Sequence, residues 1–182
     1  MARPKSAKTA PKWPTGSQAV YTLEVRLIGG PVIESFVEAN PVVSRTIRIA
    51  GAQTLDDPHT AIHHAFDREE EHLYEFQIGG RKAHDRKARA YGHPMSAPEH
   101  VGEPGYAGSA SEARIDSLGL RSRSVFFYWF DFGDDWWHHI KVVRIEDAEP
   151  GVKLPRVIER VGESPPQYLF AYEDDDEEEE GA

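Results

Sequence analysis

Alternation of apolar and polar side chains predicts several strands in the first half of the chain. Residues 20–28 alternate strictly, with Tyr21, Leu23, Val25 and Leu27 as the apolar members. This period of two predicts a strand with one buried face. Three further β-rich stretches follow, Val32–Val37, Val42–Ile49 and His72–Ile78. Glycine and proline lie between them, which predicts an antiparallel start to a sheet.

A change to helical spacing predicts a short helix after residue 53. The Thr54 hydroxyl lies three residues before Asp57, which resembles a capping box. The apolar residues that then share one face are Leu55, Ile62, Ala65 and Phe66. We expect this helix to end near Asp67 and a second short helix to cover Leu154–Val161. Residues 81–111 show no period and are predicted to form a long surface loop.

Two aromatic-rich segments predict a central β-hairpin. Ser124–Phe132 and Trp136–Ile145 flank a turn at Gly133. Because Phe126, Tyr128 and Phe130 alternate with Phe127 and Trp129, the first strand is expected to be buried on both faces. The predicted fold class is therefore α+β: a curved, mostly antiparallel sheet with a central aromatic hairpin, packed against a few short helices.

Charge is concentrated at the two ends of the chain. The formal net charge is −10, and eight carboxylates lie between Glu173 and Glu180. The N-terminal segment carries only basic charges, on Arg3, Lys5, Lys8 and Lys12. Neither end can build a core. We expect a disordered basic arm over residues 1–17, a single domain over residues 18–172, and a disordered acidic tail over residues 173–182.

Cysteine is absent, which excludes disulfides, zinc–thiolate sites and cysteine nucleophiles. No apolar segment near the N-terminus resembles a signal peptide, and no run of 18 apolar residues could cross a bilayer. The sequence therefore predicts a soluble, cytoplasmic protein that makes no contact with membranes.

Carboxylates and imidazoles gather at the turn of the predicted hairpin. Asp131, Asp134 and Asp135 lie close in sequence to His138 and His139. One interpretation is a turn in which the aspartates accept backbone hydrogen bonds and one histidine lies in the core. The other is a metal-dependent hydrolase or nuclease in which the metal activates water. Its candidate ligands are Asp131, Asp134 and His138, with His72 as a possible fourth.

Two geometric arguments weigh against a metal. Adjacent histidines on a strand face opposite ways, so His138 and His139 cannot both bind one ion. His59 and His63 have helical i, i+4 spacing, but we expect both on the exposed side of the helix. No cofactor other than a metal ion is predicted.

The segment from Phe130 to His138, FDFGDDWWH, resembles the YDFGDxWxH signature of the plasmid pRiA4b Orf-three-like family. Supporting pieces are Arg45, Thr54-Leu55 with His59 and Ile62, the strand His72–Phe76, and Pro165–Tyr168. The chain departs from the family pattern at Ser44, Pro58 and Asp67-Arg68, and it lacks the cysteines that many members carry.

The resemblance implies an α+β fold, an association with plasmids or mobile elements, and no known reaction. The leading hypothesis is a non-enzymatic binding or accessory module that uses a cleft beside the hairpin turn, with a protein as partner. A further alternative is nucleic-acid binding through the basic arm, helped by Arg81–Arg89 and inhibited by the acidic tail. The candidate site residues are Asp131, Asp134, Asp135, Trp136, His138, His72 and Arg45.

Overall fold

A computed structural model describes residues 18–69 and 71–168. The elements in chain order are β1 (Ala19–Gly29), α1 (Glu34–Ala39), β2 (Ser44–Ala50), α2 (Asp56–Ala65), β3 (Tyr74–Ile78), β4 (Arg89–Gly92), η1 (Ala97–His100), β5 (Tyr106–Ser109), η2 (Ile115–Ser117), β6 (Val125–Phe130), β7 (Trp136–Asp147) and β8 (Arg156–Val161). Among the described residues, no helix has the length and apolar character needed to cross a membrane.

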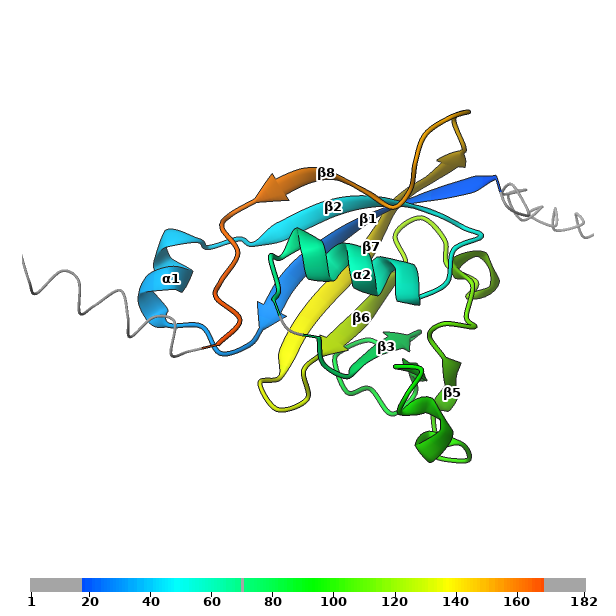
Figure 1. The fold of residues 1–182 in the computed structure, drawn as a ribbon, viewed down its shortest axis with the longest axis horizontal. Coiled ribbons are helices and arrows are strands. Elements are labelled where there is room, and N and C mark those ends of the chain that lie inside the picture. The colour runs from blue at the N-terminus through cyan, green and yellow to red at the C-terminus, as the bar shows by residue number, and fades with distance from the viewer. Residues whose placement is uncertain (1–17, 70, 169–182) are drawn as a thin grey trace, which may run out of the picture.

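One eight-stranded sheet forms the body of the protein, in the order β5-β4-β3-β6-β7-β1-β2-β8. All neighbouring strands run antiparallel except β4 and β5, which are parallel. Helix α2 lies across one face of the sheet, while α1 lies beyond the end of β1 (Figure 1). The predicted α+β class with a mostly antiparallel sheet is confirmed.

The aromatic hairpin forms as predicted, with β6 and β7 at the centre of the sheet. Phe127 pairs with His139 and Trp129 with Trp137 on the face opposite α2. The side chains of Phe126 and Tyr128 point to the other face and are fully buried. Strand β6 therefore contributes aromatic rings to both faces, as its sequence predicted.

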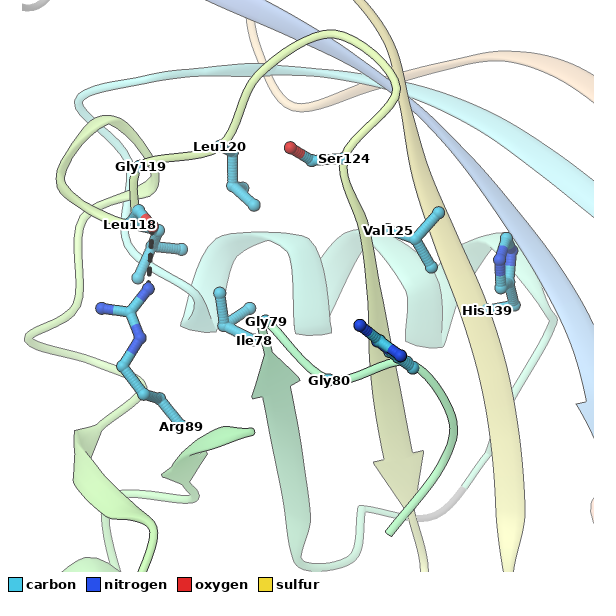
Figure 2. Close-up of a pocket in the computed structure, with 11 residues that line it drawn as sticks. Ile78, Gly79, Gly80, Arg89, Leu118, Gly119, Leu120, Ser124, Val125 and His139 are labelled. Carbon is cyan, nitrogen blue, oxygen red and sulfur yellow. Dashed lines mark hydrogen bonds between the residues drawn. The ribbon is translucent and has the colours of Figure 1, made fainter. Parts of the chain in front are cut away.

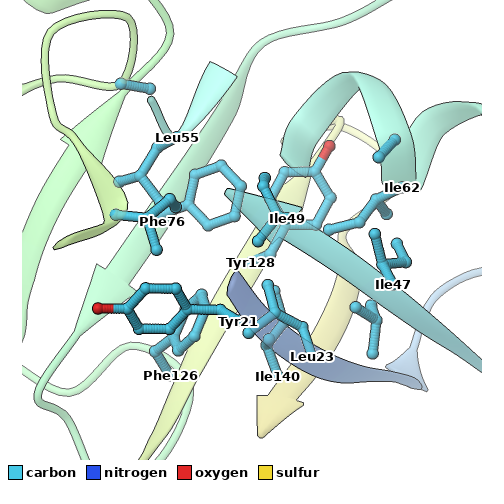
Figure 3. Close-up of a cluster of buried hydrophobic side chains, with 14 of the residues drawn as sticks. Tyr21, Leu23, Ile47, Ile49, Leu55, Ile62, Phe76, Phe126, Tyr128 and Ile140 are labelled. Atoms are coloured by element: carbon cyan, nitrogen blue, oxygen red, sulfur yellow. The ribbon is translucent and has the colours of Figure 1, made fainter. Parts of the chain in front are cut away.

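The hydrophobic core fills the space between α2 and the sheet (Figure 3). Leu55 and Ile62 come from the helical segment, and Leu23 and Ile49 from the strands beneath it. The start of α2 shows only half of the predicted capping box. The Asp57 carboxylate accepts the Thr54 backbone N–H at 2.9 Å, but the Thr54 hydroxyl donates to this same carboxylate and does not cap the helix backbone. This carboxylate therefore ties the entry of the helix to its first turn.

The predicted strand Val32–Val37 is wrong, because residues 34–39 form helix α1. Val32 and Phe36 are spaced four residues apart, and both pack against the core. Val32 lies before the helix, and a separation of four would place both residues on one face of a strand as well, so this spacing does not distinguish the two structures. The three valine and isoleucine residues favoured the strand prediction.

The predicted helix Leu154–Val161 is also wrong. Residues 156–161 form β8, which pairs antiparallel with β2. The exposed edge of β2 offers a row of backbone partners, and Val157 packs against the core from there. Tertiary pairing of this kind overrides weak local propensity.

The predicted loop 81–111 contains two short strands, so that prediction was only partly right. Strand β4 pairs with β3, and β5 pairs with β4. Both strands are only four residues long. Backbone hydrogen bonds hold them in the sheet, and such bonds do not require a hydrophobic period, so no pattern in the sequence indicated these strands. The predicted arm and tail, residues 1–17 and 173–182, lie outside the described residues, so the domain boundaries stay predictions.

Candidate functional site

Asp131 shapes the turn at the tip of the hairpin. Its Oδ1 accepts the backbone N–H groups of Gly133 at 3.2 Å and Asp134 at 3.4 Å, the pattern of an Asx turn. Its own backbone adopts φ 52°, a left-handed conformation that aspartate tolerates better than most residues. The other carboxylate oxygen, Oδ2, lies 3.5 Å from His72 Nε2. Asp131 therefore supports the turn and also faces an imidazole.

His72 joins the hairpin tip to the C-terminal segment. Its Nε2 lies 2.8 Å from the Tyr168 hydroxyl, and the same nitrogen faces Asp131. His72 therefore links Asp131 of the hairpin tip to Tyr168 of the C-terminal segment through this one nitrogen.

The neighbouring turn residues have separate surroundings. Asp135 Oδ1 accepts the indole N–H of Trp137 at 2.8 Å, and Asp134 is partly exposed at the turn. Trp136 is fully buried, and the Arg68 guanidinium carbon lies 3.6 Å from its ring centroid. This cation–π contact supports the packing of Trp136 against the core.

His138 lies in the core and away from the turn. It pairs with Tyr128, and its ring contacts the Phe66 ring edge-on, with centroids 4.9 Å apart. Neither ring nitrogen makes a hydrogen bond of acceptable geometry with a described residue. Burial, followed by the charge of Arg68, holds the pKa of His138 well below its ordinary value, and a contact with the Tyr128 backbone opposes this. His138 is therefore neutral at physiological pH.

The proposed metal ligands are consequently not gathered around one point. Asp131 faces His72 at the tip, while His138 points into the core beside Phe66. Across residues 18–69 and 71–168, no group of three or more His, Asp or Glu side chains is arranged to hold a metal ion. The arrangement gives no geometric support to a metal-dependent hydrolase.

Arg45 is buried and acts as a bridge between three segments. Its Nε donates to the Ala65 carbonyl at the end of α2 at 2.7 Å, and its Nη1 donates to the Val161 carbonyl at 2.9 Å. Its Nη2 donates to the Ser164 hydroxyl at 2.8 Å, which in turn donates to Asp67. The side chain is only 2% exposed, so this predicted site residue lies out of reach of solvent.

The sequence did not predict a buried polar network centred on His59. Its Nδ1 lies 2.7 Å from the Tyr128 hydroxyl, and its Nε2 lies 3.0 Å from a Glu71 oxygen. The ring stacks on Tyr74 with centroids 3.8 Å apart, and the Tyr74 hydroxyl donates to Asp56. Burial lowers the pKa of His59 to about 4, against the opposing effect of Glu71.

The prediction that His59 and His63 are exposed is wrong, since they are 5% and 6% exposed. The sequence did contain a signal that both histidines are buried. At helical spacing they share one face with two apolar residues, Ile62 and Phe66. The imidazoles occupy that apolar face because Tyr128 and Glu71 satisfy His59, and Glu71 also lies 3.7 Å from His63.

A cleft beside the hairpin turn, here called the aromatic cleft, lies on the face of the sheet opposite α2. It has a volume of about 400 Å³, and its lining includes Trp129, Phe132, Tyr106, Glu75, Glu103 and Arg86. The Trp129 ring stacks on Trp137 with centroids 5.1 Å apart and contacts Phe132 at 4.1 Å. His84 packs edge-on against both tryptophans. The result is a rigid aromatic wall beside the turn.

We expect a pair of substitutions at Asp131 to separate its turn role from its charge. Asp131→Ala removes the Asx acceptor at a left-handed position and should cost about 1–2 kcal/mol of unfolding free energy. Asp131→Asn keeps an acceptor but loses the charge facing His72, and should cost less than about 1 kcal/mol. Urea unfolding of both variants measures this, and equal losses would contradict the turn role.

Comparisons with known proteins agree with this fold. Among solved structures, the protein of unknown function MM3350 from Methanosarcina mazei Go1 is 24% identical, with a TM-score of 0.64. The match covers 89% of this chain and 82% of that one, and it concerns the fold alone. No curated protein matches the sequence. The family model described as plasmid pRiA4b ORF-3-like protein matches residues 35–170. Since that range includes most of the chain, the protein belongs to the plasmid pRiA4b ORF-3-like family.

Proposed function

We propose that the protein is a non-enzymatic binding module and that its aromatic cleft receives a basic side chain of a protein partner. The observation that carries this proposal is the meeting of aromatic rings and carboxylates in one concave surface beside the hairpin turn. Aromatic anchoring sites of this kind dominate the energetics of many protein interfaces. An accessory role in a plasmid or mobile element is the setting we infer from the family.

The charges of the aromatic cleft favour a cationic ligand group. Glu75, Asp85 and Glu103 contribute three carboxylates to its lining, against the single guanidinium of Arg86. A Lys or Arg side chain laid over the exposed part of the Phe132 ring would combine a cation–π contact with these carboxylates. Such contacts contribute roughly 0.5–2 kcal/mol each, depending on how fully they are desolvated.

The carboxylates of the cleft are held in position before any partner binds. Asp85 accepts the backbone N–H groups of Arg81 at 2.8 Å and Lys87 at 3.0 Å, which lowers its pKa. Glu103 lies 3.1 Å from His100 Nδ1, and Glu75 accepts a hydrogen bond from Gln77 at 2.8 Å. Preorganised groups of this kind reduce the entropic cost of binding.

A binding role also agrees with the geometry of the hairpin tip. Asp131 is engaged with backbone N–H groups, and His72 contacts Asp131 and Tyr168 through one nitrogen. These contacts support a structural role for the hairpin tip, at the edge of a binding surface.

We expect Trp129→Ala and Phe132→Ala each to weaken binding of a basic peptide at least tenfold, because each removes part of the aromatic wall. The probes are three synthetic decapeptides that are identical except for a central Arg, Leu or Glu. Calorimetry gives the affinity, and the indole N–H signal of Trp129 reports where the peptide binds. Phe132 is 37% exposed, so its truncation should not unfold the protein.

The matched control is Val143→Ala, an exposed apolar residue of β7 that does not line the cleft. This variant should bind the Arg peptide as tightly as the original protein does. The proposal fails if the Glu peptide binds as tightly as the Arg peptide, or if both aromatic truncations leave the affinity unchanged.

A further inference from the structure

A second cleft, here called the basic cleft, lies where β3 ends, at the opposite end of the hairpin from its turn. It has a volume of about 580 Å³ and is lined by Gly79–Arg81, Leu118–Leu120, Ser124, Val125, Ile78, Arg89 and His139. Figure 2 shows Arg89 and His139 on opposite sides of the opening, with Leu120, Ile78 and Val125 between them. Apolar side chains therefore lie between groups that can be cationic.

The lining of this cleft contains two arginines and a histidine but no carboxylate. The acidic residues nearest to this lining along the chain are Asp116 and Glu75, and Asp116 is paired with Arg114. Asp85, the acidic residue nearest to Arg81, uses both of its oxygens to accept the backbone N–H groups of Arg81 and Lys87. Asp85 also lines the aromatic cleft. The positive charge of the basic cleft is consequently not neutralised by the residues that line it.

The donors of the basic cleft are available to a ligand. The Arg81 guanidinium makes no hydrogen bond or ion pair with any residue within 18–69 and 71–168. Arg89 is held by the Leu118 carbonyl at 2.9 Å, which orients its guanidinium and leaves further N–H groups to donate. The Ser124 hydroxyl oxygen accepts the Arg121 backbone N–H at 2.9 Å, so its proton can be donated elsewhere.

Two neighbouring cations extend the positive region beyond the lining. Arg26 of β1 lies directly opposite His139 in the sheet, and Lys141 of β7 lies directly opposite Val125. Both side chains are exposed. Lys141 also pairs with Glu24, which offsets part of its charge, whereas Arg26 pairs with Ser44 on its other side. Anions approaching this end of the sheet therefore meet a field that favours them.

From this arrangement we propose that the basic cleft binds a small molecule carrying a phosphate group. Arginine forks match the geometry of phosphate oxygens and bind them through paired, charge-assisted hydrogen bonds. The volume lies in the range of small-molecule sites, and the apolar residues between the cations suit an aromatic or apolar ligand body. This site is separate from the aromatic cleft, so either proposal can fail without the other.

The test is calorimetric titration of the full-length protein with three probes: adenosine monophosphate, adenosine, and a ten-nucleotide thymidine oligonucleotide. We expect the monophosphate to bind at least tenfold more tightly than adenosine, because adenosine lacks the phosphate. Backbone amide signals of Gly79, Gly80 and Gly119 should shift on binding, since these glycines line the cleft. Arg81→Gln should weaken monophosphate binding at least about tenfold.

The variant Arg81→Gln is the cleanest probe, because the Arg81 guanidinium makes no hydrogen bond or ion pair within residues 18–69 and 71–168, and its loss should not alter the fold. The matched control is Arg156→Gln, an exposed arginine on the edge strand β8 at the other side of the sheet. It should leave the affinity unchanged within twofold. Equal affinity for adenosine and the monophosphate, or unchanged affinity in Arg81→Gln, would overturn the proposal. Tighter binding of the oligonucleotide would overturn it in favour of a nucleic-acid surface.

Discussion

Replacing Arg45 with alanine is expected to lower the free energy of unfolding by about 3–5 kcal/mol. The side chain donates to the carbonyls of Ala65, Ser44 and Val161 in a buried setting. Without it, these acceptors stay buried and unsatisfied, and a cavity remains beneath Phe66, whose ring lies 4.8 Å from the guanidinium carbon. For a domain of this size, the melting temperature should fall by roughly 10 °C.

Two other variants define the origin of this loss. Arg26→Ala removes an exposed arginine of β1 opposite Ser44, and should change stability by less than about 0.5 kcal/mol. Arg45→Lys keeps the charge but loses the planar fork, so it should recover only part of the stability. Chemical denaturation of all three measures the effect. A loss in Arg45→Ala no greater than in Arg26→Ala would show that the bridge is dispensable.

Stability is expected to fall as the pH is lowered from about 7 to 4. The folded protein holds the pKa of His59 at about 4, whereas the ordinary value is 6.5. Between these values the unfolded chain binds more protons than the folded one, so acid favours unfolding. The contribution of His59 is fully present above pH 6.5 and lost as the pH falls towards 4. The shift corresponds to about 3 kcal/mol.

His138 acts in the same direction, since burial also lowers its pKa. The groups that face His59 are Glu71, His63, Asp56 and the hydroxyl of Tyr128. Glu71 favours the charged ring, but it is 66% exposed, so solvent screens its effect. Desolvation of the imidazole therefore determines the sign.

The measurement is the unfolding free energy of the original protein and of His59→Gln at several pH values between 4 and 7. The variant should cost stability at pH 7 but lose less of it on acidification, so the two curves converge by about 3 kcal/mol. His100→Gln is the control, because His100 is a partly exposed histidine paired with Glu103. Parallel curves for His59→Gln and the original protein would contradict the depressed pKa.

The aromatic hairpin and the first strand could be predicted from the sequence because their information is local. In β1 and β6, side chains two residues apart share a face, so the alternation of Leu23 with Glu24 already assigns the buried side. Helix α2 was predicted for the same reason, since its apolar residues recur at helical spacing. Family membership also followed from a contiguous signature in the hairpin turn.

Other elements depended on partners that are distant in sequence. Strand β8 forms because the edge of β2 offers hydrogen bonds, β4 forms because the edge of β3 does, and β5 forms because the edge of β4 does. None of the three has a hydrophobic period that could distinguish it from a loop or a helix. The helix α1 was misread because three β-branched residues within Val32–Val37 favoured a strand.

The same difference between local and distant information applies to the residues of the predicted site. Sequence proximity determined that Asp131 would form hydrogen bonds within its own turn, because both partners lie within three residues of it. Only the tertiary structure decided that His138 points into the core, that Arg45 bridges α2 and β8, and that His59 contacts Tyr128. Periodicity predicts which face of a helix or strand a side chain occupies. The groups that the side chain contacts there belong to segments distant in the sequence, and no local pattern identifies them.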